Sequence, residues 1–155
     1  MKQNKFVAWL VLVAAGSFAA SVAQADVKTD QAIAKAEEQF AKGKPDDAIK
    51  SLVKLAGSTH SVEAYLALAR LQEMNGNADQ SAESIAKAIE VSGSATAELK
   101  GQALAASARL ALRAGTGRDA LNAAMKAVAA DKNPHTLGTL ASAHARVGDA
   151  KSSHD

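Results

Sequence analysis

The sequence predicts an all-α fold, a right-handed solenoid of about three and a half stacked helical hairpins. Apolar residues recur at steps of three and four along almost the whole chain after residue 25, which is the spacing of one helix face. Alanine is abundant, whereas β-branched and aromatic residues are sparse, and this composition favours helix over strand. Glycines at positions 43, 76, 115 and 148 follow one another at intervals of 33, 39 and 33 residues, the period expected of two-helix repeats.

The N-terminal segment has the pattern of a targeting signal. Lys2 and Lys5 precede an unbroken apolar run over residues 6–15, and Ala23–Ala25 matches the small-residue cleavage pattern. We expect residues 1–25 to be a cleavable signal peptide and the protein to be periplasmic or secreted. The alternative is an uncleaved N-terminal membrane anchor, which the cleavage pattern and the polar residues that follow it disfavour.

The remaining residues, 26–155, are expected to form one domain with no net charge. Loss of Lys2 and Lys5 reduces the 18 basic residues to 16, which equals the 16 acidic residues. Neutral charge disfavours nucleic acid or an anionic lipid surface as a partner. The chain has no cysteine, which excludes disulfides, thiol catalysis and cysteine metal sites.

The first repeat is expected at about residues 29–60. Its first helix carries Phe40 on its apolar face and ends at Gly43, because glycine can adopt the left-handed conformation that terminates a helix. Pro45 opens the second helix, where its missing N–H has no cost. The expected buried stripe of this second helix comprises Ala48, Ile49, Leu52, Leu55 and Ala56.

The second repeat is expected at residues 61–94. Ser61 is a suitable N-cap for its first helix, and Gly76 ends that helix. The expected core positions of its two helices are Tyr65, Leu68 and Ala69, followed by Ala82, Ile85, Ala88 and Ile89.

The third repeat, at residues 95–132, follows an insertion. The longer glycine interval places about six extra residues between Val91 and Gly101, where residues 92–94 can turn and residues 95–100 can lengthen the next helix. Gly115 ends that helix. The expected core residues of the repeat are Leu104, Ala108, Ala111 and Leu112, then Ala120, Leu121, Ala124, Ala127 and Val128.

The fourth repeat, residues 133–155, is expected to be incomplete. Asn133 and Pro134 supply an N-cap and a first-turn proline for a helix that should end at Gly148. A partner helix would then begin at residue 149. Apolar residues of the last helix would stay partly uncovered, which predicts a homo-oligomer or a docking contact through the C-terminal end.

This pattern resembles the tetratricopeptide repeat, a 34-residue unit of two helices. The second repeat carries the resemblance best, through Tyr65, Leu68, Ala69, Gly76, Ile85 and Ala88 at the family's preferred positions. Ser81 stands where the family has alanine, Ser107 replaces a leucine in the third repeat, and the usual proline near the end of the repeat is missing from the first two. The resemblance implies that the first helices of the repeats line a concave face that binds a protein or peptide.

The resemblance also assigns partner-binding positions on that face. They are Glu37, Phe40, Leu66, Arg70, Glu73, Met74, Arg109, Leu112, Arg113 and Arg146. The same register adds Asp30, Ile33, Ala41, Glu63, Ala67, Gln102, Ala105, Ala106, His135, Gly138, Ser142 and Ala145. Arginines gather toward the C-terminal half, and a guanidinium pairs bidentately with a carboxylate. We therefore expect the groove to take an acidic segment or a free C-terminus. The alternative is that these arginines are solvated or pair with Glu73 and its neighbours.

No constellation for catalysis is present in the sequence. The four histidines are dispersed, and His135 and His144 are nine residues apart, too far to chelate one ion on a straight helix. We find no metalloprotease, phosphate-loop or nucleophile-elbow motif. The prediction is a non-enzymatic scaffold of the cell envelope that needs no cofactor, metal or small-molecule substrate. The alternative function is a structural oligomer that self-assembles through repeat stacking or the incomplete C-terminal repeat.

Overall fold

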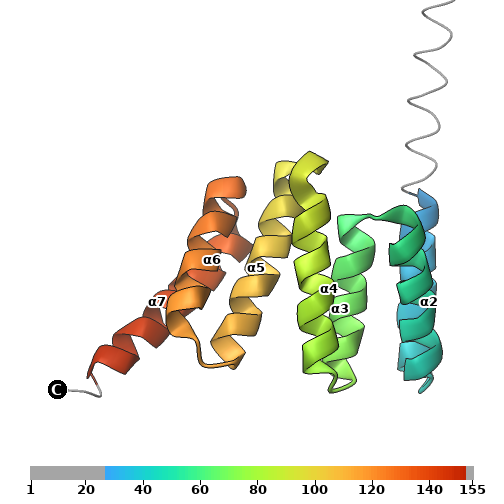
Figure 1. Ribbon diagram of the computed structural model, residues 1–155, viewed down its shortest axis with the longest axis horizontal. Helices are drawn as coiled ribbons and strands as arrows, with labels where there is room; N and C mark the ends of the chain where they lie inside the picture. Colours follow the sequence, from blue (N-terminus) through green and yellow to red (C-terminus); the bar gives the residue numbers. More distant parts are fainter. Residues whose placement is uncertain (1–26, 153–155) are drawn as a thin grey trace, which may run out of the picture.

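The computed structural model describes residues 27–152, and this part of the chain is a row of helices without a β-strand. The helices lie side by side in chain order, from residues 27–41 at one end to the last helix at the other (Figure 1). After the helical residues 27–41 come α2 (Pro45–Thr59), α3 (Val62–Met74), α4 (Ala78–Val91), the 3₁₀ turn η1 (Ser92–Ser94), α5 (Ala97–Arg113), α6 (Gly117–Ala130) and α7 (Pro134–Ser152). The predicted signal peptide, residues 1–25, lies outside the described residues.

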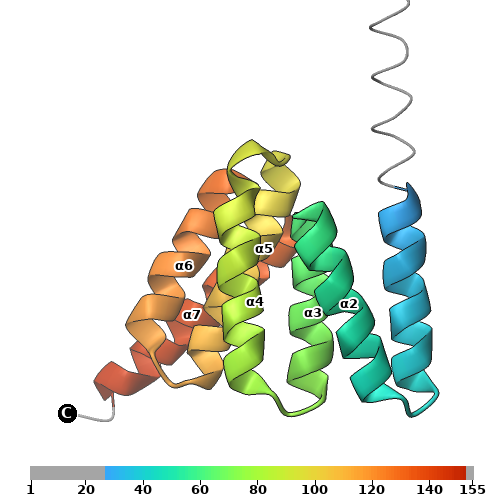
Figure 2. The ribbon, with the colours of Figure 1, turned by 45° about the vertical axis from the view of Figure 1, so that its right-hand side comes forward.

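The helices form consecutive antiparallel hairpins that stack into a solenoid, as predicted (Figure 2). Each helix from α2 onward packs on the next helix in the chain. In addition, α3 packs on α5, and α5 packs on α7. The first helices of successive hairpins therefore lie together along one face, which becomes the inner face of the stack.

Helix starts follow the capping residues that the sequence predicted. The Ser61 hydroxyl accepts a hydrogen bond from the Ala64 N–H at 3.2 Å, and Pro45 opens α2. Pro134 opens α7, and the Asn133 side-chain oxygen accepts from the Thr136 N–H at 3.0 Å. These contacts satisfy N–H groups that have no partner within the helix itself.

Three of the four repeat glycines end helices, and the prediction for the fourth is wrong. Gly43, Gly76 and Gly115 have φ values of 77°, 82° and 78°, the left-handed region that favours glycine. Gly148 instead lies within α7, which continues to Ser152. No separate partner helix therefore begins at residue 149 in the described part of the chain. Glycine permits a left-handed turn without imposing one, and the residues after Gly148 are compatible with helix.

The predicted insertion lies between the second and third hairpins. Residues Ser92–Ser94 form η1, and Thr96 caps α5 by accepting from the Leu99 N–H at 3.3 Å. The inserted residues lengthen α5 to 17 residues, compared with 13 in α3. As a result, α5 has an additional N-terminal turn that α3 lacks.

The core consists of small clusters, each joining consecutive helices. Leu52 is fully buried and packs with Leu68 and Ala36, which joins residues 27–41 to α2 and α3. A second cluster, of Ala108, Ala120, Ala124 and Ala143, joins α5, α6 and α7. Because most of these side chains are alanine, the helices pack closely while each residue buries little apolar area. Within residues 27–152, no helix combines the length and the apolar character that crossing a membrane requires.

Candidate functional site

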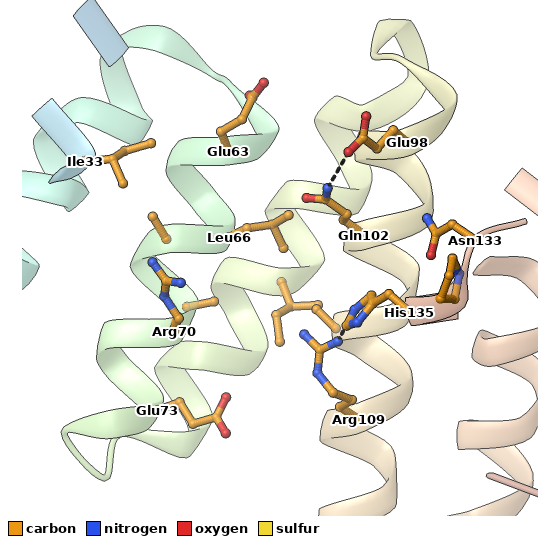
Figure 3. Close-up of a pocket in the computed structure, with 15 residues that line it drawn as sticks. Ile33, Glu63, Leu66, Arg70, Glu73, Glu98, Gln102, Arg109, Asn133 and His135 are labelled. Carbon is orange, nitrogen blue, oxygen red and sulfur yellow. Dashed lines mark hydrogen bonds between the residues drawn. The ribbon is translucent and has the colours of Figure 1, made fainter. Parts of the chain in front are cut away.

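A groove with a volume of about 790 Å³ opens on the inner face, between α3 and α5. Residues 27–41 contribute to one side of it, and the start of α7 contributes to the other (Figure 3). The residues that line it are Ile33, Glu63, Leu66, Ala67, Ala69, Arg70, Glu73, Ile85, Glu98, Gln102, Ala106, Arg109, Asn133, Pro134 and His135. We call this site the α3–α5 groove.

Helical spacing brings the lining residues of each wall to one face. On α3, Glu63, Leu66 and Arg70 follow one another at three- and four-residue steps. On α5, Glu98 and Arg109 are eleven residues apart, close to three full turns, and therefore share a face. Each wall thus carries an acid near its N-terminal end and an arginine further along.

The middle of the groove is apolar. Ala69, Ile85 and Ala106 are buried together, and the half-buried Leu66 packs against them. Figure 3 shows Leu66 between the acidic and basic side chains of α3. This cluster gives the groove a floor of aliphatic carbon from three helices.

One end of the groove is acidic. Glu63 and Glu98 lie at the same end, on α3 and α5 respectively (Figure 3). The Glu98 carboxylate accepts a hydrogen bond from the Gln102 side-chain amide at 3.2 Å. Among the described residues, no ion pair reaches either glutamate.

Two arginines near the other end are neutralised by glutamates of a neighbouring repeat. Arg70 forms an ion pair with Glu37, which joins α3 to residues 27–41. Arg113 forms an ion pair with Glu73, which joins α5 to α3. These two arginines therefore pair with glutamates of the protein itself, which was the alternative to binding an acidic partner.

Arg109 differs from those two arginines because its partner is an imidazole. Its guanidinium donates to His135 Nε2 at 2.7 Å, across the gap between α5 and α7. Since arginine can only donate, His135 must accept at Nε2 and carry its proton on Nδ1. Burial lowers the pKa of Arg109, because removal of water disfavours its charged form. Among the described residues, no ion pair supplies a countercharge to Arg109.

The structure brings some of the expected binding residues together and separates others. Leu66, Arg70, Glu73 and Arg109 line the α3–α5 groove. Glu37 and Arg113 are ion-pair partners of lining residues.

Besides Glu37 and Arg113, four other expected residues lie outside the groove lining. Phe40 and Leu112 pack against the two core clusters at opposite ends of the stack. Met74 is the last residue of α3 and is 63% exposed. Arg146 lies against Gly117 at the start of α6. The repeat register predicts which face of a helix a residue lies on, but not how far along the helix the groove extends. This explains why these four residues do not line the groove.

The principal residue that sequence reasoning missed is Glu98. It falls in the inserted turn, outside the repeat register, so the family positions could not identify it. Its eleven-residue distance from Arg109 was the available signal, because that spacing returns to the same helix face. Within the described residues, no group of three His, Cys, Asp or Glu side chains could hold a metal ion.

Comparison with protein-family models gives no match for this chain. No curated protein matches it either.

Solved structures do match the fold. The TPR2AB domain of yeast Sti1, in a complex with pHSP90, superposes with a TM-score of 0.72 at 14% identity, covering 81% of this chain and 50% of that one. The type III secretion chaperone SycD of Yersinia enterocolitica, in complex with a peptide of the translocator YopD, gives 0.62 at 18% identity and covers 81% of this chain and 94% of that one. MamA gives 0.60 at 19% identity, with 77% and 64% covered.

The chain spans half the length of the Sti1 structure and just under two thirds of the MamA structure. The shared feature is the row of helical hairpins, at sequence identities that establish the fold only. The repeat pattern of the sequence, the stacked hairpins and these matches together show that the chain has the tetratricopeptide-repeat fold.

Proposed function

We propose that the protein is a non-enzymatic scaffold that binds a segment of a partner protein in the α3–α5 groove. The observation that carries this proposal is the aliphatic floor around Leu66, bordered by charged residues from two parallel walls. A volume of about 790 Å³ is within the range of ligand sites, and an open groove between helices suits a polypeptide segment. Two of the similar folds, Sti1 and SycD, were solved with pHSP90 and with a YopD peptide respectively.

Site-specific photo-crosslinking tests this function. A photo-reactive residue in place of Gln102, inside the groove, should give a discrete adduct when the protein is expressed in its native host. The same residue at Val53, which is 52% exposed on α2 and lies outside the groove, is the control. Leu66→Glu should abolish the Gln102 adduct, because a carboxylate on the apolar floor would lose hydration when a partner binds.

Circular dichroism must first show that the Leu66→Glu variant keeps its helix content. If Gln102 gives no adduct, or one that a folded Leu66→Glu protein still forms, the groove is not the binding site.

We also propose that this binding takes place outside the cytoplasm, in the periplasm or after secretion. Support comes from the basic, apolar and small-residue order of residues 1–25. Mass spectrometry of the protein recovered from the envelope fraction should find a mature N-terminus at Asp26. A protein that stays in the cytoplasm with Met1 or Lys2 at its start would contradict the proposal.

Self-association is a second candidate, supported by exposed apolar side chains near the C-terminal end. Leu137 on α7 is 42% exposed, and Met125 on α6 is 54% exposed. Sedimentation at increasing concentration should then show a dimer that Leu137→Lys dissociates. Identical monomeric profiles for both proteins would exclude this candidate.

A further inference from the structure

The two walls of the α3–α5 groove carry their charges in the same order. On α3, Glu63 precedes Arg70 by seven residues, about 10 Å along the helix axis. On α5, Glu98 precedes Arg109 by eleven residues, about 16 Å. Figure 3 shows Glu63 and Glu98 at one end of the groove and Arg70 and Arg109 further along, with Leu66 between them and Glu73 beyond Arg70. The groove is therefore electrostatically polar along its length.

Internal ion pairs decide which of these charges remain available to a partner. Arg70 is neutralised by Glu37, and Glu73 is neutralised by Arg113. In the described part of the chain, Glu63 and Glu98 belong to no ion pair. What remains is two negative charges at one end and the positive charge of Arg109 at the other.

We infer that the partner segment is itself dipolar, with a lysine or arginine that meets Glu63 and Glu98, apolar residues over Leu66, and a carboxylate that meets Arg109. This inference rests on the proposed function and specifies the chemistry of its partner. Glu98 and Arg109 are about 16 Å apart along the helix axis, and an extended chain rises about 3.3 Å per residue, so the two opposite charges of the segment are about five residues apart. The segment is therefore short and has one charge of each sign.

The same charges disfavour segments of one sign. A purely acidic segment would place carboxylates beside Glu63 and Glu98, and like charges at short range repel. A purely basic segment would place a cation beside Arg109. Among the described residues, the hydrogen-bond partner of the exposed Arg109 side chain is an imidazole and not a carboxylate, so a carboxylate of the segment would supply the countercharge that Arg109 lacks. This refines the expectation of an acidic partner that the arginine positions raised.

Selection from a phage-displayed library of random twelve-residue peptides tests the inference on four forms of the purified full chain. Wild-type protein should enrich peptides with one base and one acid separated by apolar residues. Arg109→Glu should instead enrich peptides that carry a basic residue at each end. Glu63→Lys combined with Glu98→Lys should shift them to acids at both ends. Leu66→Glu should retain none of the wild-type peptides.

A synthetic, fluorescein-labelled version of the enriched wild-type peptide gives the quantitative readout. Its affinity should fall at least tenfold in Arg109→Glu, and it should weaken as ionic strength rises, because salt screens exposed charge pairs. Gln80→Glu, a charge change on α4 outside the groove, is the matched control and should leave the affinity within twofold.

The outcomes separate this inference from the proposed function. Peptides that depend on Leu66 but show the same charge pattern on all charge variants would overturn the dipolar partner and leave the groove as a peptide site. If no enriched peptide depends on Leu66, the groove does not bind peptides and the proposed function fails as well. Circular dichroism of each variant confirms that the comparison is made between folded proteins.

Discussion

Ser81 and Ser84, which are three residues apart on α4, are both buried but differ in their hydrogen bonds. The Ser84 hydroxyl donates to the Gln72 side-chain oxygen at 2.6 Å, a buried contact between α4 and α3. The Ser81 hydroxyl has no hydrogen-bond partner among the described residues. Ser81 also occupies the position where tetratricopeptide repeats have alanine. The two hydroxyls should therefore contribute to stability with opposite sign.

Ser81→Ala should raise the free energy of unfolding by about 1 kcal/mol, because it removes an unsatisfied buried hydroxyl and introduces a better helix former. Ser84→Ala should lower it by about 1 to 3 kcal/mol, because Gln72 would then be buried without its partner. Urea denaturation followed by circular dichroism measures both changes. Destabilisation by Ser81→Ala would show that its hydroxyl has a partner after all.

Gly101, near the N-terminal end of α5, should not tolerate alanine. A Cβ at this position would lie 2.9 Å from the Cβ of Asp131, closer than real contacts allow. Overpacking of this kind costs about 1 to 3 kcal/mol, which exceeds the gain of about 1 kcal/mol in helix propensity. Thermal unfolding of Gly101→Ala should therefore show a lower midpoint.

Gly138 supplies the control for that substitution. It also lies inside a helix, α7, but a Cβ there would meet no atom within 4 Å. Gly138→Ala should raise the midpoint, because only the gain in helix propensity remains. Equal effects at the two glycines would mean that α5 and α6 are not closely packed at Asp131.

At the scale of the site residues, the repeat register predicted the face of each helix but not the contacts between repeats. Leu66, Arg70 and Arg109 could be assigned to the inner face from the binding positions that the tetratricopeptide resemblance implies. The pairing of Arg70 with Glu37 and of Arg113 with Glu73 depends on how adjacent hairpins are placed, which spacing does not determine. These pairs change the available charge of the groove, and therefore the kind of partner it suits.

At the scale of helices, a glycine ends a helix only where the chain adopts the left-handed conformation. Gly76 does so, with φ of 82°, and the Asn77 N–H then returns to the Gln72 carbonyl at 2.8 Å. Gly148 is helical instead, although its place in the repeat is the same. The glycine spacing correctly predicted where three helices end, at Gly43, Gly76 and Gly115. It could not predict the end of α7, because the residues before and after Gly148 are compatible with helix.

Alanine substitution distinguishes the two glycines. Gly76→Ala should lower the free energy of unfolding by about 1 to 2 kcal/mol, the cost of a left-handed conformation for a residue with a Cβ. Gly148→Ala should leave it unchanged or raise it by up to about 1 kcal/mol, because alanine favours the helix that Gly148 already adopts. Chemical denaturation of both variants provides the measurement. A clear loss of stability for Gly148→Ala would indicate that α7 ends at Gly148 in solution.

At the scale of the whole molecule, stability is distributed along the stack. The cluster around Leu52 and the cluster around Ala124 share no residue, and each joins only neighbouring helices. Solenoids of this kind behave as a chain of coupled repeats, so damage at one end need not unfold the other. The sequence predicted this architecture through its period, which is a property of all repeats together.

Leu52→Ala tests this distributed stability. The substitution should cost about 2 to 5 kcal/mol, because Leu52 is fully buried and its loss leaves a cavity. Hydrogen exchange should show faster exchange in residues 27–41 and α2, while α6 and α7 keep their protection. A uniform loss of protection in every helix would indicate one cooperative unit instead.

The inserted residues before α5 have a consequence for the size of the partner. Because they lengthen α5, the Glu98-to-Arg109 distance exceeds the Glu63-to-Arg70 distance by about 6 Å, which is four residues of helix. The length of the insertion therefore determines how far apart a partner's opposite charges must be to reach Glu98 and Arg109 together. Homologues that differ only in the length of this insertion would then select partners by charge spacing, with the rest of the groove unchanged.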